Sequence, residues 1–262
     1  DTVVSPVTIN APTLSGSITA YPDTIVCSGE SVLLVAPPCA GCTYAWSNGG
    51  TSATINNIAA GTYTVTVTDA QGCTATATET VTENPELVVS LNASDDASCF
   101  GGNDGAVSLV VAGGTTAYTY VWSNGASTED IINQPAGTYS VSVYDGNGCM
   151  KTTTVTITQP AQLTTTISGN TVACNGGSTG IVDLTVFGGS PSYTYLWSNG
   201  VTTQDITNSP AGTYTPTITD NRGCTLVGQT FTITEPAVLA IAVDSTMNAT
   251  CSTNTDGAAY VT

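Results

Sequence analysis

The stretch that decides the fold reads Ala136-Gly137-Thr138-Tyr139-Ser140-Val141-Ser142-Val143-Tyr144-Asp145-Gly146-Asn147-Gly148-Cys149. Tyr139, Val141 and Val143 alternate with polar residues, and a period of two places successive side chains on opposite faces of a β-strand. The glycines on both sides of this pattern are typical of turns. The stretch therefore predicts a half-buried strand, followed by a tight turn that ends in a cysteine.

The same stretch occurs three times, at an interval of about 75 residues. Its tyrosine is Tyr63, Tyr139 or Tyr214, and a tryptophan precedes it as Trp46, Trp122 or Trp197. Each copy leads to an alternating strand closed by proline, which cannot donate to a strand ladder and so marks a boundary. The sequence predicts a preceding repeat's last strand, three whole repeats and the first part of a further one: 1–12, 13–85, 86–160, 161–236 and 237–262.

Each whole repeat carries roughly six or seven short strand patterns with turn signals about every 8–12 residues, which is typical of a β-sandwich. No window shows a helical period. We therefore predict an all-β fold of tandem immunoglobulin-like (PKD or fibronectin III-like) sandwiches, arranged as an extended rod. A tyrosine after a glycine turn, behind a tryptophan and ahead of a cysteine, resembles the tyrosine corner of such sandwiches. Three copies at one offset favour this core and corner role over a ligand-stacking one.

Two local signals make finer predictions about the strands. Asn48-Gly49, Asn124-Gly125 and Asn199-Gly200 predict two-residue hairpins, in which both turn residues take positive φ. Pro216 stands where the other repeats have valine. Because proline removes a ladder hydrogen bond, we expect an edge position or a bulge there.

The composition limits the possible partners. The chain has 262 residues with 19 acidic side chains, two basic ones and no histidine, for a net charge of −17. Nucleic acids and anionic lipids both bind through lysine and arginine, so neither is expected as a partner. No apolar run of about 20 residues is present, so no membrane span is expected.

Nine cysteines in a threonine-rich β sequence predict an oxidising, extracellular setting. Our preferred pairing lies within repeats: Cys27 with Cys73, Cys99 with Cys149 and Cys174 with Cys224. The alternative joins neighbouring repeats, as in Cys99 with Cys224 and Cys27 with Cys149. An extra pair in the first repeat, Cys39 and Cys42, lacks the further ligands of a zinc site and predicts a local disulfide.

Catalytic groups are scarce. A Ser–His–Asp or Cys–His arrangement needs histidine, which the chain lacks. Asp69, Asp145 and Asp220 occupy one equivalent turn position, where an aspartate bonds the backbone of its own turn. Calcium is the one cofactor that the surplus carboxylates leave open, although no Asp-x-Asp-x-Asp-Gly loop is present. We predict no enzyme, no catalytic residue and no resident metal.

The ordered motifs resemble the SprB-type repeat. They run as Cys-x-Gly-Gly, Tyr-Thr-Tyr-x-Trp-Ser-Asn-Gly, Asp-Ile, Ala-Gly-Thr-Tyr and Asp-x-x-Gly-Cys, closely over residues 86–236 and more loosely over 13–85. The family occurs in very large surface proteins of the Bacteroidota, including gliding-motility adhesins exported by type IX secretion. The resemblance implies a secreted, adhesive or spacer protein of the cell surface, with no catalytic residues. Asp-Thr-Val and its variants are also similar to that phylum's O-glycosylation motif, which implies sugar at Thr2, Thr24 and Ser245.

Two functions follow. The first is a non-catalytic structural or adhesive protein that forms a cell-surface stalk or filament. Its partners would be neighbouring repeats or copies of itself. In one form of this hypothesis the partial repeats at 3–12 and 239–262 add strands to the sheet edges of neighbouring chains. The second is an array of glycan-binding modules that use tyrosine and tryptophan faces to hold surface glycans.

Overall fold

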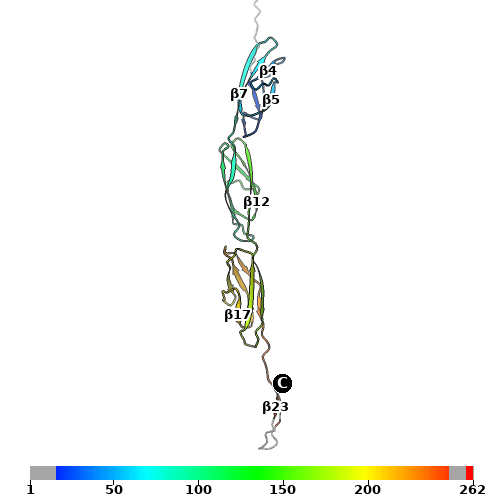
Figure 1. Ribbon diagram of the computed structural model, residues 1–262, viewed down its shortest axis with the longest axis vertical. Coiled ribbons are helices and arrows are strands. Elements are labelled where there is room, and N and C mark those ends of the chain that lie inside the picture. The colour runs from blue at the N-terminus through cyan, green and yellow to red at the C-terminus, as the bar shows by residue number, and fades with distance from the viewer. Residues whose placement is uncertain (1–15, 248–257, 262) are drawn as a thin grey trace, which may run out of the picture. The chain divides into compact units, whose positions relative to one another are not determined.

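The computed structural model describes residues 16–247 and 258–261, and it confirms the all-β class (Figure 1). No helix occurs among these residues, so none could cross a membrane. The strands form immunoglobulin-like sandwiches around three separate clusters of buried apolar side chains. These clusters draw on residues 18–81, 87–157 and 172–233, so each repeat has a core of its own.

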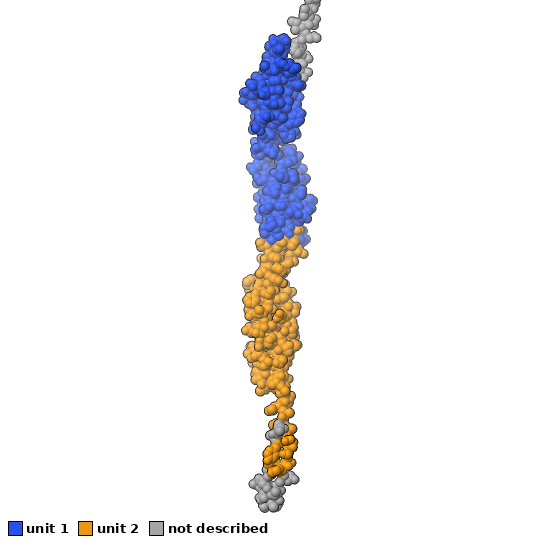
Figure 2. Space-filling view, turned by 90° about the vertical axis from the view of Figure 1, so that its right-hand side faces the viewer, with its two compact units in different colours: residues 1–95, 106–133, 137–157 blue, residues 96–105, 134–136, 158–262 orange. Residues whose placement is uncertain are grey.

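The chain divides into two compact units (Figure 2). One comprises residues 1–95, 106–133 and 137–157, and the other comprises 96–105, 134–136 and 158–262. The short segment 96–105 therefore groups with the third repeat, although it lies within the second in sequence. The last strand predicted for a preceding repeat, at residues 1–12, lies outside the described part of the chain.

The first repeat is built from two sheets. One has the order β1-β3-β5 and the other β2-β7-β6-β4. Their bounds are β1 Thr19–Tyr21, β2 Ile25–Val26, β3 Val32–Val35, β4 Thr43–Trp46, β5 Thr54–Ile58, β6 Gly61–Thr68 and β7 Thr74–Glu83. The alternation read from the sequence of β6 is realised, since Val65 and Val67 are buried against the opposite sheet.

The second repeat repeats this plan with the orders β11-β9-β8 and β10-β12-β13. The bounds are β8 Val88–Asp95, β9 Gly105–Ala112, β10 Thr119–Trp122, β11 Ile131–Gln134, β12 Gly137–Tyr144 and β13 Met150–Ile157. The fold-deciding stretch is β12. Tyr139, Val141 and Val143 all point into the core, at 7%, 1% and 0% exposure.

The third repeat has the orders β14-β15-β17, β16-β19-β20 and β18-β21. The bounds are β14 Thr164–Asn170, β15 Gly180–Phe187, β16 Thr194–Trp197, β17 Ile206–Ser209, β18 Gly212–Tyr214, β19 Pro216–Thr219, β20 Thr225–Val227 and β21 Phe231–Ile233. A final hairpin pairs β22 Val243–Met247 with β23 Ala258–Val261.

Pro216 explains why the third repeat has more, shorter strands. It begins β19, which lies between β16 and β20, so the expected edge position is wrong. The long strand of the other repeats is instead broken into β18 and β19, since proline has no N–H to continue the ladder. Its carbonyl still accepts a hydrogen bond from Gly228 N at 2.8 Å, and Gly228 lies where the partner strand is broken too.

The Asn-Gly turns are present, but they do not form the predicted two-residue hairpins. β4 pairs with β6 and β5 with β3, so Asn48-Gly49 connects the two sheets instead of two paired strands. Only the glycine of each pair has positive φ, at 88°, 86° and 85° for Gly49, Gly125 and Gly200. The asparagine instead accepts a hydrogen bond from the N–H two residues ahead, as Asn48 Oδ1 does from Gly50 N at 3.1 Å. The turn signal was genuine, but the strands on either side of it belong to different sheets.

Candidate functional site: the joints between repeats

The structure overturns the preferred disulfide pairing. Cys27 is bonded to Cys149 and Cys99 to Cys224, whereas Cys73 and Cys174 are free and exposed. The bridges therefore join successive repeats, and among the described cysteines only Cys39 and Cys42 pair within a repeat.

The length of β7 explains the error. Cys73 directly precedes this ten-residue strand, whereas Cys27 directly follows Val26, which pairs with Glu83 at the other end of the strand. At about 3.3 Å per residue the two cysteines lie roughly 30 Å apart. A disulfide needs Cα atoms within about 7 Å, and the Cα atoms of Cys27 and Cys149 are 5.5 Å apart.

One half of each joint is a Cys-x-Gly loop, formed by residues 27–29, 99–101 or 174–176. Its glycine has a positive φ of 79°, 71° or 72° in the three copies. The N–H of that glycine donates to a side chain at the end of the same repeat's last strand: Gly29 to Glu83, Gly101 to Gln159 and Gly176 to Glu235, at 3.0, 2.7 and 2.8 Å. This bond holds the loop, and the cysteine that begins it, at the end of the sandwich.

The other half is an Asp-x-x-Gly-Cys turn, formed by residues 69–73, 145–149 or 220–224. The Asp Oδ1 accepts two backbone N–H groups in every copy. For Asp145 these come from Asn147 at 2.9 Å and Cys149 at 2.8 Å. The carboxylate therefore closes the turn and fixes the position of its cysteine.

Joint 1, at Cys27–Cys149, contains a buried polar network centred on Asn84, which is 4% exposed. Asn84 Nδ2 donates to Asp145 Oδ2 in a short hydrogen bond. Asn84 Oδ1 accepts from Thr115 Oγ1 at 2.7 Å and from Asn147 Nδ2 at 3.1 Å. Because both ends of the amide are satisfied, the linker after the first repeat is tied to two loops of the second.

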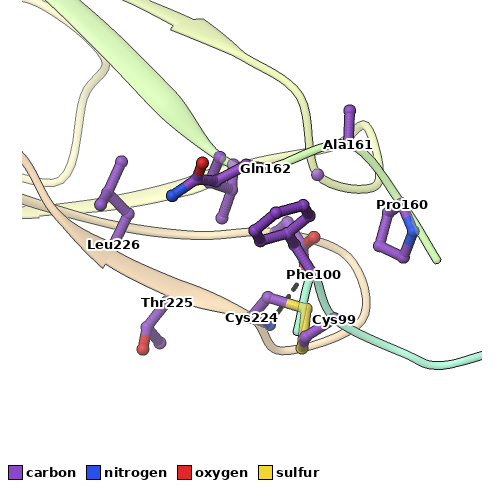
Figure 3. Close-up of a pocket in the computed structure, with 11 residues that line it drawn as sticks. Cys99, Phe100, Pro160, Ala161, Gln162, Cys224, Thr225 and Leu226 are labelled. Carbon is purple, nitrogen blue, oxygen red and sulfur yellow. Dashed lines mark hydrogen bonds between the residues drawn. A yellow bond between two sulfur atoms is a disulfide. The ribbon is translucent and has the colours of Figure 1, made fainter. Parts of the chain in front are cut away.

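Joint 2, at Cys99–Cys224, has Pro160 and Phe100 beside the disulfide (Figure 3). They line a shallow pocket of about 220 Å³ together with Gln162 and Leu226. Ligand pockets usually enclose roughly 300–1,000 Å³, so this one is small. It contains no tryptophan or tyrosine.

Both joints share one backbone frame. Gly114 N donates to Pro85 O at 3.0 Å in joint 1, and Gly189 N donates to Ala161 O at 2.8 Å in joint 2. The glycine before each has φ of 72° or 75°, and a Cβ on Gly113 or Gly188 would lie 1.9 or 2.0 Å from the carbonyl oxygen of Glu86 or Gln162. Only glycine therefore allows the linker to lie this close to the next repeat.

The turn aspartates of both joints are held as carboxylates. Burial by itself would raise the pKa of Asp145, but N–H donors from Thr115, Cys149, Asn147 and Asn84 outweigh it and lower that pKa below its ordinary value of 3.8. Burial opposes ionisation of Asp220 as well, and backbone donors, first among them Ser190, again lower the pKa. Each charge therefore contributes to the stability of its joint.

The first repeat differs at the equivalent place. Asp69 Oδ1 accepts from Gln71 N and Cys73 N at 2.9 and 2.8 Å, as in the other copies. Asp69 Oδ2, however, is buried and has no hydrogen-bond partner in the described part of the chain. The Gly-Gly loop that supplies a donor in the other repeats is replaced here by the Cys39–Cys42 loop.

The predicted aromatic residues lie away from the joints. Trp46, Trp122 and Trp197 are 4%, 2% and 1% exposed, and each indole N–H donates to a carbonyl six residues ahead at 2.9 Å. Tyr63 OH donates to Ala59 O at 3.1 Å and Tyr214 OH to Pro210 O at 2.9 Å, and Tyr139 is 7% exposed. The three indoles are thus core residues, with no face open to a ligand.

The remaining predicted sites are scattered. Thr24 is half-buried and Ser245 exposed, whereas Thr2 lies outside the described residues. Within residues 16–247 and 258–261, no three histidine, cysteine, aspartate or glutamate side chains converge on a cation site. Sequence reasoning missed Asn84, because a lone asparagine before a proline signals only a linker.

Two segments of the chain, residues 91–127 and 166–202, match the SprB repeat. These matches confirm the resemblance predicted from the motifs for the two segments. No curated protein sequence gives a significant match.

Several solved structures are similar to this chain at low sequence identity. The N-terminal eight Ig domains of Down Syndrome Cell Adhesion Molecule (DSCAM) isoform 1.30.30 are 15% identical, with a TM-score of 0.46 over 81% of this chain. This chain spans 35% of that structure. Three N-terminal domains of the bacteriophage RB49 outer capsid protein Hoc are 15% identical, with a TM-score of 0.36. That match covers 86% of this chain and 99% of the Hoc structure. Drosophila OTK extracellular domains 3–5 are 13% identical, with a TM-score of 0.29. That match covers 81% of this chain and 94% of the OTK structure.

Proposed function

We propose that this chain is a non-catalytic, extracellular structural or adhesive protein whose repeats are linked into a cell-surface stalk or filament. The observation that supports this most is the course of the disulfides, which join each repeat to the next at both joints. A catalytic or ligand-binding array needs no covalent bond between its modules. A protein that carries tension between its two ends benefits from one.

Other features agree with this role. Disulfides are typical of extracellular proteins, and immunoglobulin-like repeats of this kind are generally non-enzymatic. The net charge of −17 causes repulsion between chains, which favours extended and soluble arrangements. The resemblance to SprB repeats makes a bacterial surface the expected setting, with gliding motility and type IX export as its narrower form.

The bond pattern predicts how the chain extends under force. When the ends are pulled, the taut path crosses from Cys27 to Cys149, returns along the chain to Cys99 and crosses to Cys224. Roughly 150 residues are removed from that path, which shortens the fully extended chain by roughly 500 Å.

Single-molecule force spectroscopy on the oxidised chain tests this proposal. We expect full extension to increase by that length after reduction, and not to change after reduction of a variant with all four joint cysteines replaced by serine. An oxidised chain that extends as far as the reduced one would contradict a load-carrying role for the joints.

The glycan-binding alternative has less support, because the indoles are buried and no tryptophan or tyrosine lines the pockets described at the joints. Tryptophan fluorescence distinguishes the two. A structural array gives blue-shifted emission that oligosaccharides do not change, whereas quenching by a sugar would favour the alternative.

A further inference from the structure

The loop before β4 differs from the matching loops of the other two repeats. The number of residues from the strand tryptophan to the turn aspartate is the same in every repeat, so the loops align without a gap. In this alignment Cys39 stands where the second repeat has Thr115, and Cys42 stands where it has Tyr118. The Cys39–Cys42 disulfide therefore replaces two residues that shape the loop elsewhere.

In the second and third repeats this loop donates a hydrogen bond to the turn aspartate. Thr115 N donates to Asp145 Oδ2 at 2.9 Å, and Ser190 N donates to Asp220 Oδ2 at 2.8 Å. A tyrosine hydroxyl holds each loop in this position, through a 2.6 Å bond to the carbonyl of the loop's first glycine. The second oxygen of the turn carboxylate thus has a donor within its own repeat.

In the first repeat the corresponding N–H has a different partner. Cys39 N donates to Tyr44 OH at 3.3 Å. The same hydroxyl lies 3.3 Å from Cys39 O and 3.5 Å from Pro37 O, to either of which it can donate. Asp69 Oδ2 is buried and bonds to none of the described residues. The donor that the other repeats provide for this oxygen is therefore occupied elsewhere.

The loop and the aspartate are nevertheless neighbours. Thr43, the first residue of β4, pairs with Thr68, the last residue of β6. In an antiparallel pair the residues just beyond such a pair lie across from one another, which places Cys42 across from Asp69. A local rearrangement of the loop would therefore bring the Cys39 N–H to Asp69 Oδ2.

The local disulfide should be easier to reduce than the joint disulfides. Its cysteines are three residues apart, whereas the joint disulfides span 122 and 125 residues. Loop-closure entropy grows with the number of residues enclosed, so the local bond stabilises the fold less than a joint bond does. Both of its cysteines are partly exposed, and exchange with a thiol requires such access.

We propose that Cys39–Cys42 is a reversible modification site for small-molecule thiols. Reduction frees the loop, and the Cys39 N–H moves from Tyr44 OH to Asp69 Oδ2. The buried oxygen then has a donor, which offsets part of the stability lost with the bond. The turn takes the form that it has in the other two repeats. This site does not depend on the load-carrying role of the joints.

The reductant is the small-molecule thiol itself. Its thiolate attacks one sulfur of the Cys39–Cys42 bond, forms a mixed disulfide and releases the other cysteine as a thiolate. A second small-molecule thiolate attacks the small molecule's sulfur in the mixed disulfide and releases the remaining cysteine. The protein disulfide gains two electrons and two protons, and two thiols become one small-molecule disulfide.

The first measurement ranks the three described disulfides. The free thiols of the full chain are blocked by alkylation, and the chain is equilibrated with mixtures of reduced and oxidised dithiothreitol. New thiols are labelled with a second reagent and located by peptide mass mapping. We expect half-labelling of Cys39 and Cys42 at a ratio of reduced to oxidised reagent roughly a hundredfold lower than for either joint disulfide. An equal or reversed order would overturn the proposal.

The second measurement follows hydrogen exchange of the Cys39 amide by NMR. After selective reduction we expect its protection, corrected for the intrinsic exchange rate, to rise roughly tenfold, equivalent to about 1.4 kcal/mol. A variant with Cys39→Ser and Cys42→Ser should show the same protection at this position without reductant. Unchanged or lower protection after reduction would mean that the disulfide only holds the loop, and would overturn the proposal.

Asp69→Asn is the matched control. Its side-chain carbonyl can still accept the N–H groups of Gln71 and Cys73, whereas its NH₂ group cannot accept the Cys39 N–H. Reduction should therefore no longer raise the protection of the Cys39 amide, and an equal rise in this variant would contradict the proposed partner. Blue-shifted tryptophan emission shows that each variant is folded. Failure of these tests leaves the proposed function standing, because that function rests on the joint disulfides.

Discussion

Joint 1 and joint 2 use the same bond but surround it with different chemistry. Cys27–Cys149 is accompanied by the buried Asn84 network, whereas Cys99–Cys224 is accompanied by Pro160 and Phe100. Pro160 occupies the position of Asn84 when the two linkers are aligned. The side-chain amide of Asn84 is fully hydrogen-bonded in joint 1, whereas the proline ring at this position in joint 2 has no hydrogen-bond donor.

What the joints share shows what a joint needs. Both have the Cys-x-Gly loop, the Asp-x-x-Gly-Cys turn, the disulfide and a glycine N–H bonded to the linker carbonyl. The side chains in between are replaceable. The frame should therefore account for most of the stability of a joint, and the network for a smaller part.

The largest expected effect is the loss of a disulfide. Replacing Cys27 and Cys149 together by serine removes a bond across 122 residues, and the Cys99 and Cys224 pair spans 125. We expect each double variant to lose about 4–5 kcal/mol of unfolding free energy, because loop-closure entropy depends weakly on length. Guanidinium denaturation followed by tryptophan fluorescence measures it. A much smaller loss at joint 1 would mean that the Asn84 network holds it without the bond.

Gly113→Ala and Gly188→Ala should come next. The added Cβ would lie 1.9 or 2.0 Å from a linker carbonyl oxygen at a positive φ, so we expect a loss of about 2–3 kcal/mol in each repeat, measured by urea denaturation. Gly125→Ala is the matched control, because its φ of 86° is equally strained but nothing lies within 4 Å of the new Cβ. The control should cost only about 1 kcal/mol. Equal losses would show that the linker is not tightly packed.

Asn84→Ala measures how much the hydrogen-bond network of joint 1 contributes to stability beyond the disulfide and backbone contacts that both joints share. It leaves buried partners unpaired, so we expect a loss of about 1–3 kcal/mol in unfolding free energy. Pro160→Ala, at the aligned position of joint 2, should change stability by less than about 0.5 kcal/mol. Comparable losses from both variants would contradict the view that only joint 1 depends on its side chains. Urea denaturation of both variants provides the comparison.

The smallest effect is the dependence on pH. The folded pKa values of Asp145 and Asp220 are both lowered below 3.8, so their stabilisation is complete above that pH and is lost as the pH falls through the folded values. Asp145→Asn and Asp220→Asn should therefore flatten the loss of stability in denaturation curves recorded between about pH 5 and pH 2. Asp183→Asn, on the exposed face of β15, removes the same charge and should leave the slope unchanged.

Local patterns predicted much of the fold. The alternation of Tyr139, Val141 and Val143 identified a strand and its buried face, and the spacing of the tryptophans identified the repeat. The resemblance to SprB repeats, confirmed at residues 91–127 and 166–202, followed from the same motifs. Such signals extend over about ten residues, within which a side chain's direction depends on strand geometry alone.

Relations across sheets could not be predicted in this way. The Asn-Gly turns were recognised, but which strands they connect depends on the pairing of β4 with β6 and of β3 with β5. Pro216 was recognised as a break, but its central place depends on β16 and β20. Asn84 gave no signal, because its partners come from loops 31 and 61 residues ahead.

The sequence by itself determined the all-β repeat, its period and its core residues. It also excluded any reaction that depends on a histidine side chain, because the chain has none. Only the tertiary structure decided which cysteines meet, and hence that the bonds join successive repeats. The reason is distance: β7 separates Cys27 from Cys73 by its full ten residues, while the next repeat places Cys149 against Cys27.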